Sequence, residues 1–473
     1  MAVGLSQPAP AAGSPGDLEE EFGRGGLLKP EVADEQGLTD LAVGAGGAVR
    51  AVGITGKTSC GHITCDSVYD QLVVAATAEG ALEDGFGDGG LFDTDHYLEV
   101  PYTSSSIAAL ADDAVVVAAG SRLERFEPPG NSTKLLPPSG GSVDDLLALA
   151  DGRLYVSGWI ETSPGSDLLV ERRLADGQPD PSFASDGSVS IGAGYWDGLS
   201  DLVLGPDGAL WAVGLSTQTS VSDAKLIVAR ILADGSPDPT FAGDGLETYE
   251  LTSPPEPVSM AAGIADGENL IVIARVSSGT LALRIRADGT FDPSFGSDGI
   301  VHVDRQVPGY TVDAAGLGGG RIALVRERGL SIMDTDGTVD QSFGGDGVAS
   351  PYGLRAAGAV AAGDDHVLLY GETAADLLVA KFELEDDGMA DADADGISDG
   401  ADRCPETYGP EKGAGCPALR RDVELDYWRG DGGYFTALVT PPCPGATKVR
   451  LTRRVSGEVR RRWSATATAN PTR

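Results

Sequence analysis

One twelve-residue phrase recurs along the chain and constrains its fold more than any other feature. Its four close copies are DGQPDPSFASDG, DGSPDPTFAGDG, DGTFDPSFGSDG and DGTVDQSFGGDG, at residues 176–187, 234–245, 288–299 and 336–347. Weaker copies occupy residues 16–26 and 79–90. The phenylalanines of neighbouring phrases are 48 to 64 residues apart, except for a gap of 97 between Phe86 and Phe183. We therefore expect a degenerate unit near residues 126–131, giving seven units of a length typical of solenoids or propellers.

The residues of the phrase predict its local structure. The Asp-Gly step is a turn, because glycine accepts positive φ and aspartate tolerates it. Asp180, Asp238 and Asp292 each precede Pro, which predicts an N-cap followed by a single helical turn. The phenylalanine is expected to point inward as a plug, and the second turn to lead into a strand.

Between the phrases, the sequence predicts strands. One unit contains four short candidates, at residues 245–251, 258–264, 269–276 and 280–286. Four short strands with Gly-rich turns in about 50 residues are typical of a propeller blade. No segment keeps a period of 3.6 residues, which argues against a helical solenoid. The sequence predicts an all-β fold, a β-propeller of seven four-stranded blades over residues 16–386.

The ends of the repeat region predict how the ring closes. The last unit ends near residues 377–384 without a phrase of its own, whereas the first phrase, at 17–26, has no strand before it. An open edge strand would invite aggregation. We expect the N-terminal phrase to dock beside the last blade.

The phrase D-G-x-x-D-P-[ST]-F-[GA]-x-D-G resembles the delta-60 repeat of bacterial exported proteins. The resemblance covers roughly residues 16–386, and only the region around Phe126 departs from it. It implies a propeller, and it implies no enzyme activity, cofactor or catalytic residue.

Net charge excludes some classes of partner. The chain carries 34 Lys and Arg against 72 Asp and Glu, a formal charge of −38. Such a chain repels phosphate backbones and anionic membranes, so we expect no nucleic-acid partner. No stretch approaches the ~20 apolar residues of a membrane helix, so no membrane span is expected. Residues 418–473 are the exception to the acidic balance, with 11 basic and 5 acidic side chains.

A calcium site is predicted after the repeats, in the segment DADADGISDGADRCP at residues 391–405. Oxygen ligands stand at positions 1, 3, 5, 7, 9 and 12 of a twelve-residue loop, with Gly396 at position 6. They are Asp391, Asp393, Asp395, the backbone carbonyl of Ile397, Asp399 and Asp402. This is the spacing of an EF-hand loop, and hard oxygen ligands favour calcium over a transition metal. The alternative is a solvated acidic linker.

No helical pattern flanks this loop. Residues 387–417 instead resemble the thrombospondin type 3 repeat, in the form found as a linker in bacterial surface proteins. The resemblance implies that the aspartates wrap calcium and that Cys404 and Cys416 form a disulfide.

The cysteines indicate the compartment. Cys60 and Cys65 form a close pair, as do Cys404 and Cys416, and Cys443 remains alone. Two small disulfide loops fit an exported protein; the alternative at the first pair is a reduced metal site with His62. Residues 1–15 are rich in Ala, Pro, Gly and Ser, lack a signal peptide as written, and look like a flexible start of a mature exported protein. We expect secretion or display at the cell surface.

The C-terminal residues 418–473 are expected to form a short basic β module. Strand candidates lie at 423–428, 434–440 and 448–454, and the pattern dissolves after Arg462. The segment weakly resembles the small β-sandwich modules of secreted bacterial surface proteins.

Two functions remain open from the sequence. The leading hypothesis is an exported, monomeric, non-catalytic binding or scaffold protein, which contacts a protein or glycan at the cell surface. The calcium segment would act as a spacer, and a cell-wall adhesin is a variant of this hypothesis. The alternative is an extracellular propeller hydrolase with a site in the central channel, which would need carboxylates of raised pKa. Three acidic pairs, Asp112–Asp113, Asp144–Asp145 and Asp364–Asp365, are interpreted as solvated turn residues.

Overall fold

The computed structural model describes most of the chain between residues 15 and 384, together with four strands between 422 and 467. The gaps in the first part are 31–34, 61–64, 99–104, 129–130, 164, 194, 253–254, 308, 346, 352, 364 and 374–376. Residues 15–385 form one compact unit, and the four C-terminal strands belong to a second.

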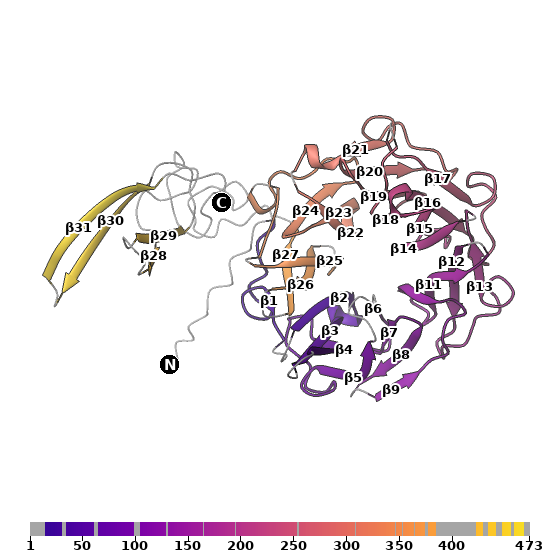
Figure 1. Ribbon diagram of the computed structural model, residues 1–473, viewed down its shortest axis with the longest axis horizontal. Coiled ribbons are helices and arrows are strands. Elements are labelled where there is room, and N and C mark those ends of the chain that lie inside the picture. The colour runs from indigo at the N-terminus through magenta and orange to yellow at the C-terminus, as the bar shows by residue number, and fades with distance from the viewer. Residues whose placement is uncertain are drawn as a thin grey trace, which may run out of the picture. The chain divides into compact units, whose positions relative to one another are not determined.

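Within the described residues, the first unit consists of seven consecutive groups of antiparallel strands (Figure 1). Blade 1 contains β2 (Glu35–Val43), β3 (Val49–Cys60), β4 (Cys65–Ala76) and β5 (Leu91–Leu98). Blade 2 contains β6 (Ser105–Ala109), β7 (Val115–Ala119), β8 (Arg122–Glu127) and β9 (Asn131–Lys134). Blade 3 contains β10 (Ser142–Ala148), β11 (Leu154–Glu161), β12 (Ser166–Arg173) and β13 (Ser188–Ile191). Blade 4 contains β14 (Trp196–Leu204), β15 (Leu210–Thr217), β16 (Lys225–Ile231) and β17 (Leu246–Tyr249). Blade 5 contains β18 (Met260–Asp266), β19 (Asn269–Val276), β20 (Gly279–Ile285) and β21 (Ile300–His302). Blade 6 contains β22 (Thr311–Leu317), β23 (Arg321–Arg326) and β24 (Gly329–Asp334). Blade 7 contains β25 (Arg355–Ala361), β26 (His366–Glu372) and β27 (Leu377–Glu383).

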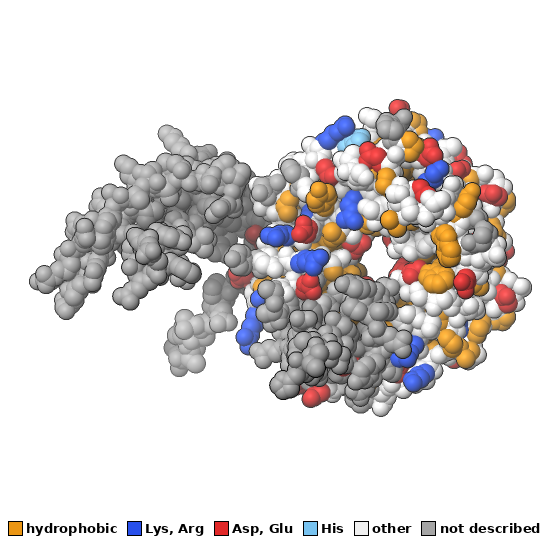
Figure 2. All heavy atoms as spheres, in the orientation of Figure 1, with side chains coloured by type: hydrophobic (Ala, Val, Ile, Leu, Met, Phe, Trp, Pro, Cys, Tyr) orange, Lys and Arg blue, Asp and Glu red, His pale blue; other side chains and the backbone are white. Residues whose placement is uncertain are grey.

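The first strand of each blade lines the centre of the ring. Neighbouring inner strands contact one another in the order β2, β6, β10, β14, β18, β22, β25 and back to β2, so the ring is closed. Figure 2 shows an opening at its centre with acidic side chains beside it. The predicted β-propeller is confirmed. Blade 6 is three-stranded, with a single bridge between Leu330 and Ala349 at the place of a fourth strand.

The N-terminal phrase closes the ring, as predicted. The short strand β1 (Leu27–Leu28) pairs with β27, the third strand of blade 7, placing Leu27 opposite Ala380. A further bridge joins Leu18 to Phe382. The last blade therefore takes its outermost strand from the start of the propeller, so that β27 is not left as an unpaired edge.

The phrase phenylalanines form plugs between blades, also as predicted. All six are at most 1% exposed: Phe22, Phe86, Phe183, Phe241, Phe295 and Phe343. Phe241 packs edge-on against Trp211 at 5.4 Å between ring centres. The glycine of the next phrase lies on the plug, since a Cβ at Gly235 would meet the ring of Phe183 at 3.0 Å. Each plug thus fills a blade interface and also holds the following Asp-Gly turn.

The degenerate unit is blade 2, where β8 and β9 follow each other with no phrase between them. Phe126 is buried but belongs to β8, as a core residue and not as the plug. Leu135 takes the plug position, because Gly177 of blade 3 contacts it in the way that Gly235 contacts Phe183. The location predicted from the 97-residue gap is therefore confirmed, with leucine replacing phenylalanine.

The second unit contains two described hairpins. β28 (Asp422–Trp428) pairs with β29 (Tyr434–Thr440), and β30 (Thr447–Val455) with β31 (Glu458–Ala467). The expectation that the strand pattern ends after Arg462 is wrong, because β31 continues to Ala467. Pairing with β30 outweighs the low strand propensity of alanine there. Among the described residues, no helix is long and apolar enough to cross a membrane.

Candidate functional site

The inner strands of the ring share an irregularity that carries a carboxylate. Blades 1, 3, 4 and 6 have a β-bulge in the inner strand, and the residue after the extra one is aspartate. These residues are Asp40, Asp145, Asp201 and Asp313. Glycine stands opposite the bulge in blade 4, because a Cβ at Gly214 would lie 2.4 Å from the carbonyl oxygen of Gly198. The bulge thus lets two strands approach closely and redirects one carboxylate.

Each of these carboxylates ties its blade to the next one. Asp40 accepts a hydrogen bond from Ile107 N of blade 2 at 2.8 Å. Asp145 accepts one from Leu202 N of blade 4 at 3.1 Å, and Asp201 one from Gly263 N of blade 5 at 2.7 Å. Asp313 bonds in the same way to the backbone amide of Ala359 in blade 7. We call these four residues the carboxylate ring.

The carboxylate ring has raised pKa values. Burial is the largest cause for all four, and it outweighs the backbone hydrogen bonds that favour ionisation. The pKa of Asp201 rises to about 6 and that of Asp313 to about 7, while that of Asp145 lies well above its ordinary value. Negative charges within the ring add to the effect, since Asp201 and Asp40 both raise the pKa of Asp313. Carboxylates of blades 1, 4 and 6 are therefore close enough to influence one another's ionisation.

Tyr370 of blade 7 completes this network. Its hydroxyl donates to Asp40 Oδ1 at 3.4 Å and occupies the space beside Gly358, where a Cβ would lie 2.2 Å from the hydroxyl oxygen. Burial, followed by the charge of Asp40, raises the pKa of Tyr370 well above its ordinary value. The phenol stays protonated as a donor, so blade 7 is tied to blade 1 by a tyrosine.

The interpretation of Asp144 and Asp145 as solvated turn residues is wrong. Both lie in β10, where Asp144 is the extra residue of the bulge. Burial raises the pKa of Asp144 to about 6, against the hydrogen bond from Ser142. A bulge and a turn both place two polar residues in succession, so the sequence alone did not separate them. Asp112 and Asp113 do lie in a turn; residue 364 of the third pair is outside the described residues.

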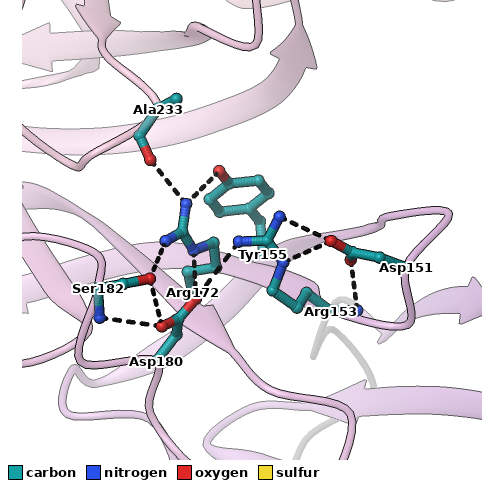
Figure 3. Close-up of polar contacts among 7 residues, drawn as sticks. All are labelled: Asp151, Arg153, Tyr155, Arg172, Asp180, Ser182 and Ala233. Atoms are coloured by element: carbon teal, nitrogen blue, oxygen red, sulfur yellow. Dashed lines mark hydrogen bonds and ion pairs between the residues drawn. The ribbon is translucent and has the colours of Figure 1, made fainter.

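The phrase aspartates perform a structural task (Figure 3). Asp180 Oδ1 accepts hydrogen bonds from Ser182 N at 2.9 Å and Ser182 Oγ at 2.7 Å, while its Oδ2 accepts from Arg172 Nε at 2.7 Å. Arg172 also donates to the carbonyl oxygen of Ala233, in the next blade, at 2.7 Å. Burial alone would raise the pKa of Asp180, but the bonds from Ser182 and Arg172 outweigh it and lower the pKa to about 2.

Two further phrases repeat this arrangement. Asp238 accepts from Thr240 N at 2.9 Å and pairs with Arg230, and Asp292 accepts from Ser294 N at 3.0 Å. The single turn predicted after Asp180, Asp238 and Asp292 is confirmed, because in each of these phrases the phenylalanine amide donates to the carbonyl of the aspartate three residues earlier. Asp180, Asp238 and Asp292 are therefore engaged in holding their phrases against the blades.

The two faces of the ring differ in what they expose. Neighbouring strands of a blade are antiparallel, so the third strand runs in the same direction as the inner strand and ends at the same face. The phrase follows the third strand, and we therefore call the face where the inner strands end the phrase face. We call the opposite face, where inner strands begin, the variable face. Its connections from blade to blade, such as 192–195, 250–259 and 303–310, differ in length. It exposes Trp196 and Tyr310, at 54% and 64%.

A cavity of about 670 Å³ lies beside blade 5. Its lining combines apolar side chains with polar ones, among them Glu256, Ser278, Asp298, His302 and Arg305. Glu256 Oε2 is engaged by the amide of Ser278 at 2.7 Å. The site offers both charges to a small polar ligand.

The predicted metal ligands lie outside the described residues: Asp391, Asp393, Asp395, Ile397, Asp399 and Asp402. Cys404 and Cys416 lie outside them too, as does His62. Cys60 and Cys65 occupy directly opposite positions in the β3–β4 hairpin. In the part of the chain that the structure describes, no three His, Cys, Asp or Glu side chains gather into a metal site.

Sequence reasoning missed the carboxylate ring, although a signal was present. Its members stand in similar tetrapeptides, L-T-D-L, V-D-D-L, L-S-D-L and T-V-D-A. Each tetrapeptide begins an inner strand's bulge. Aligning the units on their inner strands, and not on the phrase, would have revealed the repeated aspartate.

Comparisons with known proteins agree with the fold. The profile of a family described as "Domain of unknown function (DUF5122) beta-propeller" matches residues 149–183 and 205–241. Each matched segment ends at a phrase phenylalanine, which supports a propeller repeat family. No curated protein matches the chain.

Several solved structures are similar. A gluconolactonase from Xanthomonas campestris is 17% identical, with 66% of this chain and 90% of that chain covered and a TM-score of 0.37. The β-propeller domain of the Trilobed protease from Pyrococcus furiosus is 13% identical, with 75% and 97% covered and a TM-score of 0.43. An acylaminoacyl peptidase from Pyrococcus horikoshii is 10% identical, with 86% and 58% covered and a TM-score of 0.42. At these identities and scores no activity is inferred from them.

Proposed function

We propose that the chain is an exported, non-catalytic binding or scaffold protein whose propeller contacts a protein or glycan at the cell surface. One observation carries the proposal. The buried aspartate of the phrase is engaged by its own blade, as Asp180 is by Arg172, whereas the variable face exposes aromatic side chains. Exposed aromatic residues are enriched at recognition surfaces.

The rest of the chain fits this role as a spacer. The aspartates between 391 and 402 would hold calcium, and Cys404 and Cys416 would close a disulfide. The opposite positions of Cys60 and Cys65 support a second disulfide and an oxidising compartment, secreted or at the cell surface. We expect the protein to act as a monomer.

The test compares the two faces. Full-length protein with Trp196→Ala or Tyr310→Ala is applied to native cell surfaces and to a glycan array, beside Leu174→Ala and Leu204→Ala. The leucines are exposed apolar residues of the phrase face, at 36% and 38%, and serve as matched controls. The proposal expects at least tenfold weaker binding for the variable-face variants only. Equal binding by all four variants contradicts it.

A second candidate, an extracellular hydrolase with its site in the central channel, is favoured by one observation. Asp144 and Asp201 have pKa values of about 6, and Asp313 has one of about 7, which suits a general acid near neutral pH. Asp144 differs from the ring aspartates because it is not part of the inter-blade network. Hydrolysis of glycan or lactone substrates that is lost in Asp144→Asn, in a protein with an unchanged circular dichroism spectrum, would support this candidate over the first.

A further inference from the structure

The junction between blades 3 and 4 is built differently from the others. The first residue of β12 pairs in parallel with the first residue of β14, placing Ser166 beside Trp196. Ser166 N donates to the carbonyl of Tyr195 at 2.9 Å, and Ser166 Oγ donates to the carbonyl of Asp197 at 2.8 Å. These bonds hold the start of β12 next to the start of β14 at the variable face.

Two carboxylates converge on the connection that precedes β14. Asp197 Oδ2 accepts a hydrogen bond from Ala193 N at 2.6 Å. Asp167 Oδ1 lies against the preceding residue, because a Cβ at Gly192 would be 2.1 Å from it. Neighbouring residues of one loop therefore contact the two acidic groups, and Gly192 leaves the space that the Asp167 carboxylate fills.

One oxygen of this pair has no protein partner. Asp197 is only 1% exposed, and its Oδ1 is buried without a hydrogen bond. Among the described residues, no Lys or Arg forms an ion pair with Asp197 or Asp167. Burial raises the pKa of Asp197, and the negative charge of Asp167 raises it further. The hydroxyl of Ser216 and the amide of Ala193 lower this pKa but do not outweigh burial. Leaving a buried carboxylate oxygen unpaired is unfavourable, and a bound cation would remove this cost.

The pair is not part of the repeated architecture. Counting from the bulge, the positions equivalent to Asp197 in blades 1, 3, 6 and 7 are held by Gln36, Gly141, Gly309 and Leu354. Blade 4 has Lys225 at the position of Asp167. The carboxylate ring ties most blades together, whereas this pair occurs at one junction, as expected for a ligand site.

We propose that Asp167 and Asp197 bind a calcium ion at the junction of blades 3 and 4. Two carboxylates are hard ligands that suit calcium, and they need the further oxygen ligands that a hydroxyl, backbone carbonyls and water supply. Thr162 Oγ1, 3.4 Å from Asp167 Oδ1, is one such hydroxyl. The ion would fix the connection that carries Tyr195 and Trp196. The site is separate from the segment at 391–402 and does not depend on the function proposed above.

Terbium luminescence tests the site in the full-length protein. Terbium replaces calcium and emits when a nearby tryptophan transfers energy to it, and Trp196 directly precedes Asp197. Excitation of tryptophan should give terbium emission that millimolar calcium displaces, since exposed calcium modules bind at about 10⁻⁴ to 10⁻³ M. Trp196→Phe should lower the emission at least twofold. Asp197→Asn should abolish it, and Asp167→Asn should weaken terbium binding at least tenfold, which keeps the test decisive if Asp197→Asn does not fold.

Two controls separate this site from other acidic groups. Asp186→Asn changes an exposed turn aspartate of the neighbouring phrase and should leave the emission unchanged. Asp395→Asn alters the segment at 391–402 and should also leave the tryptophan-sensitised signal in place. The proposal is overturned if the unmodified protein gives no sensitised emission, or if a folded Asp167→Asn variant keeps the full emission. It is also overturned if Asp395→Asn abolishes the emission and Asp197→Asn does not.

Discussion

The carboxylate of Asp201, in the inner strand of blade 4, accepts a hydrogen bond from the backbone amide of Gly263 in blade 5 at 2.7 Å. The same relationship recurs at three other junctions, so the inside of the ring is fastened by acidic side chains of raised pKa. The predictions begin from this arrangement.

Stability should fall as pH rises from 5 to 8. The folded pKa values of Asp201 and Asp313, about 6 and about 7, lie above the ordinary value of 3.8. A raised pKa contributes stability at low pH that is lost as pH rises through the folded value. One pKa unit corresponds to about 1.4 kcal/mol, so a decrease of at least a few degrees in Tm is expected. Calorimetry between pH 5 and 8 measures it.

The slope of Tm against pH tests whether the carboxylate ring causes this pH dependence. Asp313→Asn removes the carboxylate whose pKa rises to about 7 and should flatten the decrease in Tm, even though the variant also loses one acceptor and is less stable overall. Asp186→Asn, in an exposed turn, should keep the slope. An unchanged slope in Asp313→Asn would show that the channel carboxylates do not cause the pH dependence.

The phrase plugs should dominate the stability of the blade interfaces. Phe241 is fully buried against Trp211, and truncating a buried phenylalanine costs about 3–5 kcal/mol. Phe241→Ala is expected to lower the free energy of unfolding by that amount. Val221→Ala, at a residue 84% exposed, should stay within about 0.5 kcal/mol. Urea unfolding of both variants measures the difference, and equal stabilities would contradict the role of the plug.

Removing the N-terminal closure should expose a strand edge. Deleting residues 1–28 takes away β1 and the bridge between Leu18 and Phe382, leaving the outer edge of β27 unpaired. Size-exclusion chromatography should then show aggregation. Deleting only residues 1–14 keeps these contacts and is expected to give a monomer. A monomeric 1–28 deletion with an unchanged melting temperature contradicts this view of closure.

Calcium removal should loosen the segment at 387–417 while the strands of the propeller stay folded. Chelation is expected to increase proteolysis within that segment while the far-ultraviolet circular dichroism of the propeller is preserved, because the ring is held by its own strands. The protease should cleave the Asp395→Ala variant equally fast with and without calcium. Identical cleavage of the unmodified protein in both conditions would mean that the acidic segment is only a solvated linker.

The cysteines predict a simple count of thiols. If Cys60 pairs with Cys65 and Cys404 with Cys416, alkylation of the unfolded, unreduced protein labels one cysteine, Cys443. After reduction, all five cysteines in the sequence are labelled. Mass spectrometry distinguishes this result from the five labels before reduction that a cytosolic protein with free thiols gives.

Features set by short stretches of sequence were predictable. The turn at Asp180 depends on residues within the phrase, and the closure of blade 7 followed from one missing phrase and one surplus phrase. The bulge at Asp145 was not predictable from one unit, because its backbone is set by the adjacent strand. Leu135 shows a related limit, since only its contact with Gly177 identifies it as a plug. The pairing of Asp167 with Asp197 joins two blades and has no signature in either alone.

The closing strand β1 has a consequence for the order of synthesis. Blade 7 combines residues 27–28 with residues 355–383, so the earliest part of the propeller must wait for the latest part to emerge. Until then both ends of the growing sheet array are unpaired and prone to misassembly. The ring can therefore lock only after the whole repeat region has been synthesised, which makes completion of the last blade the committing step of folding.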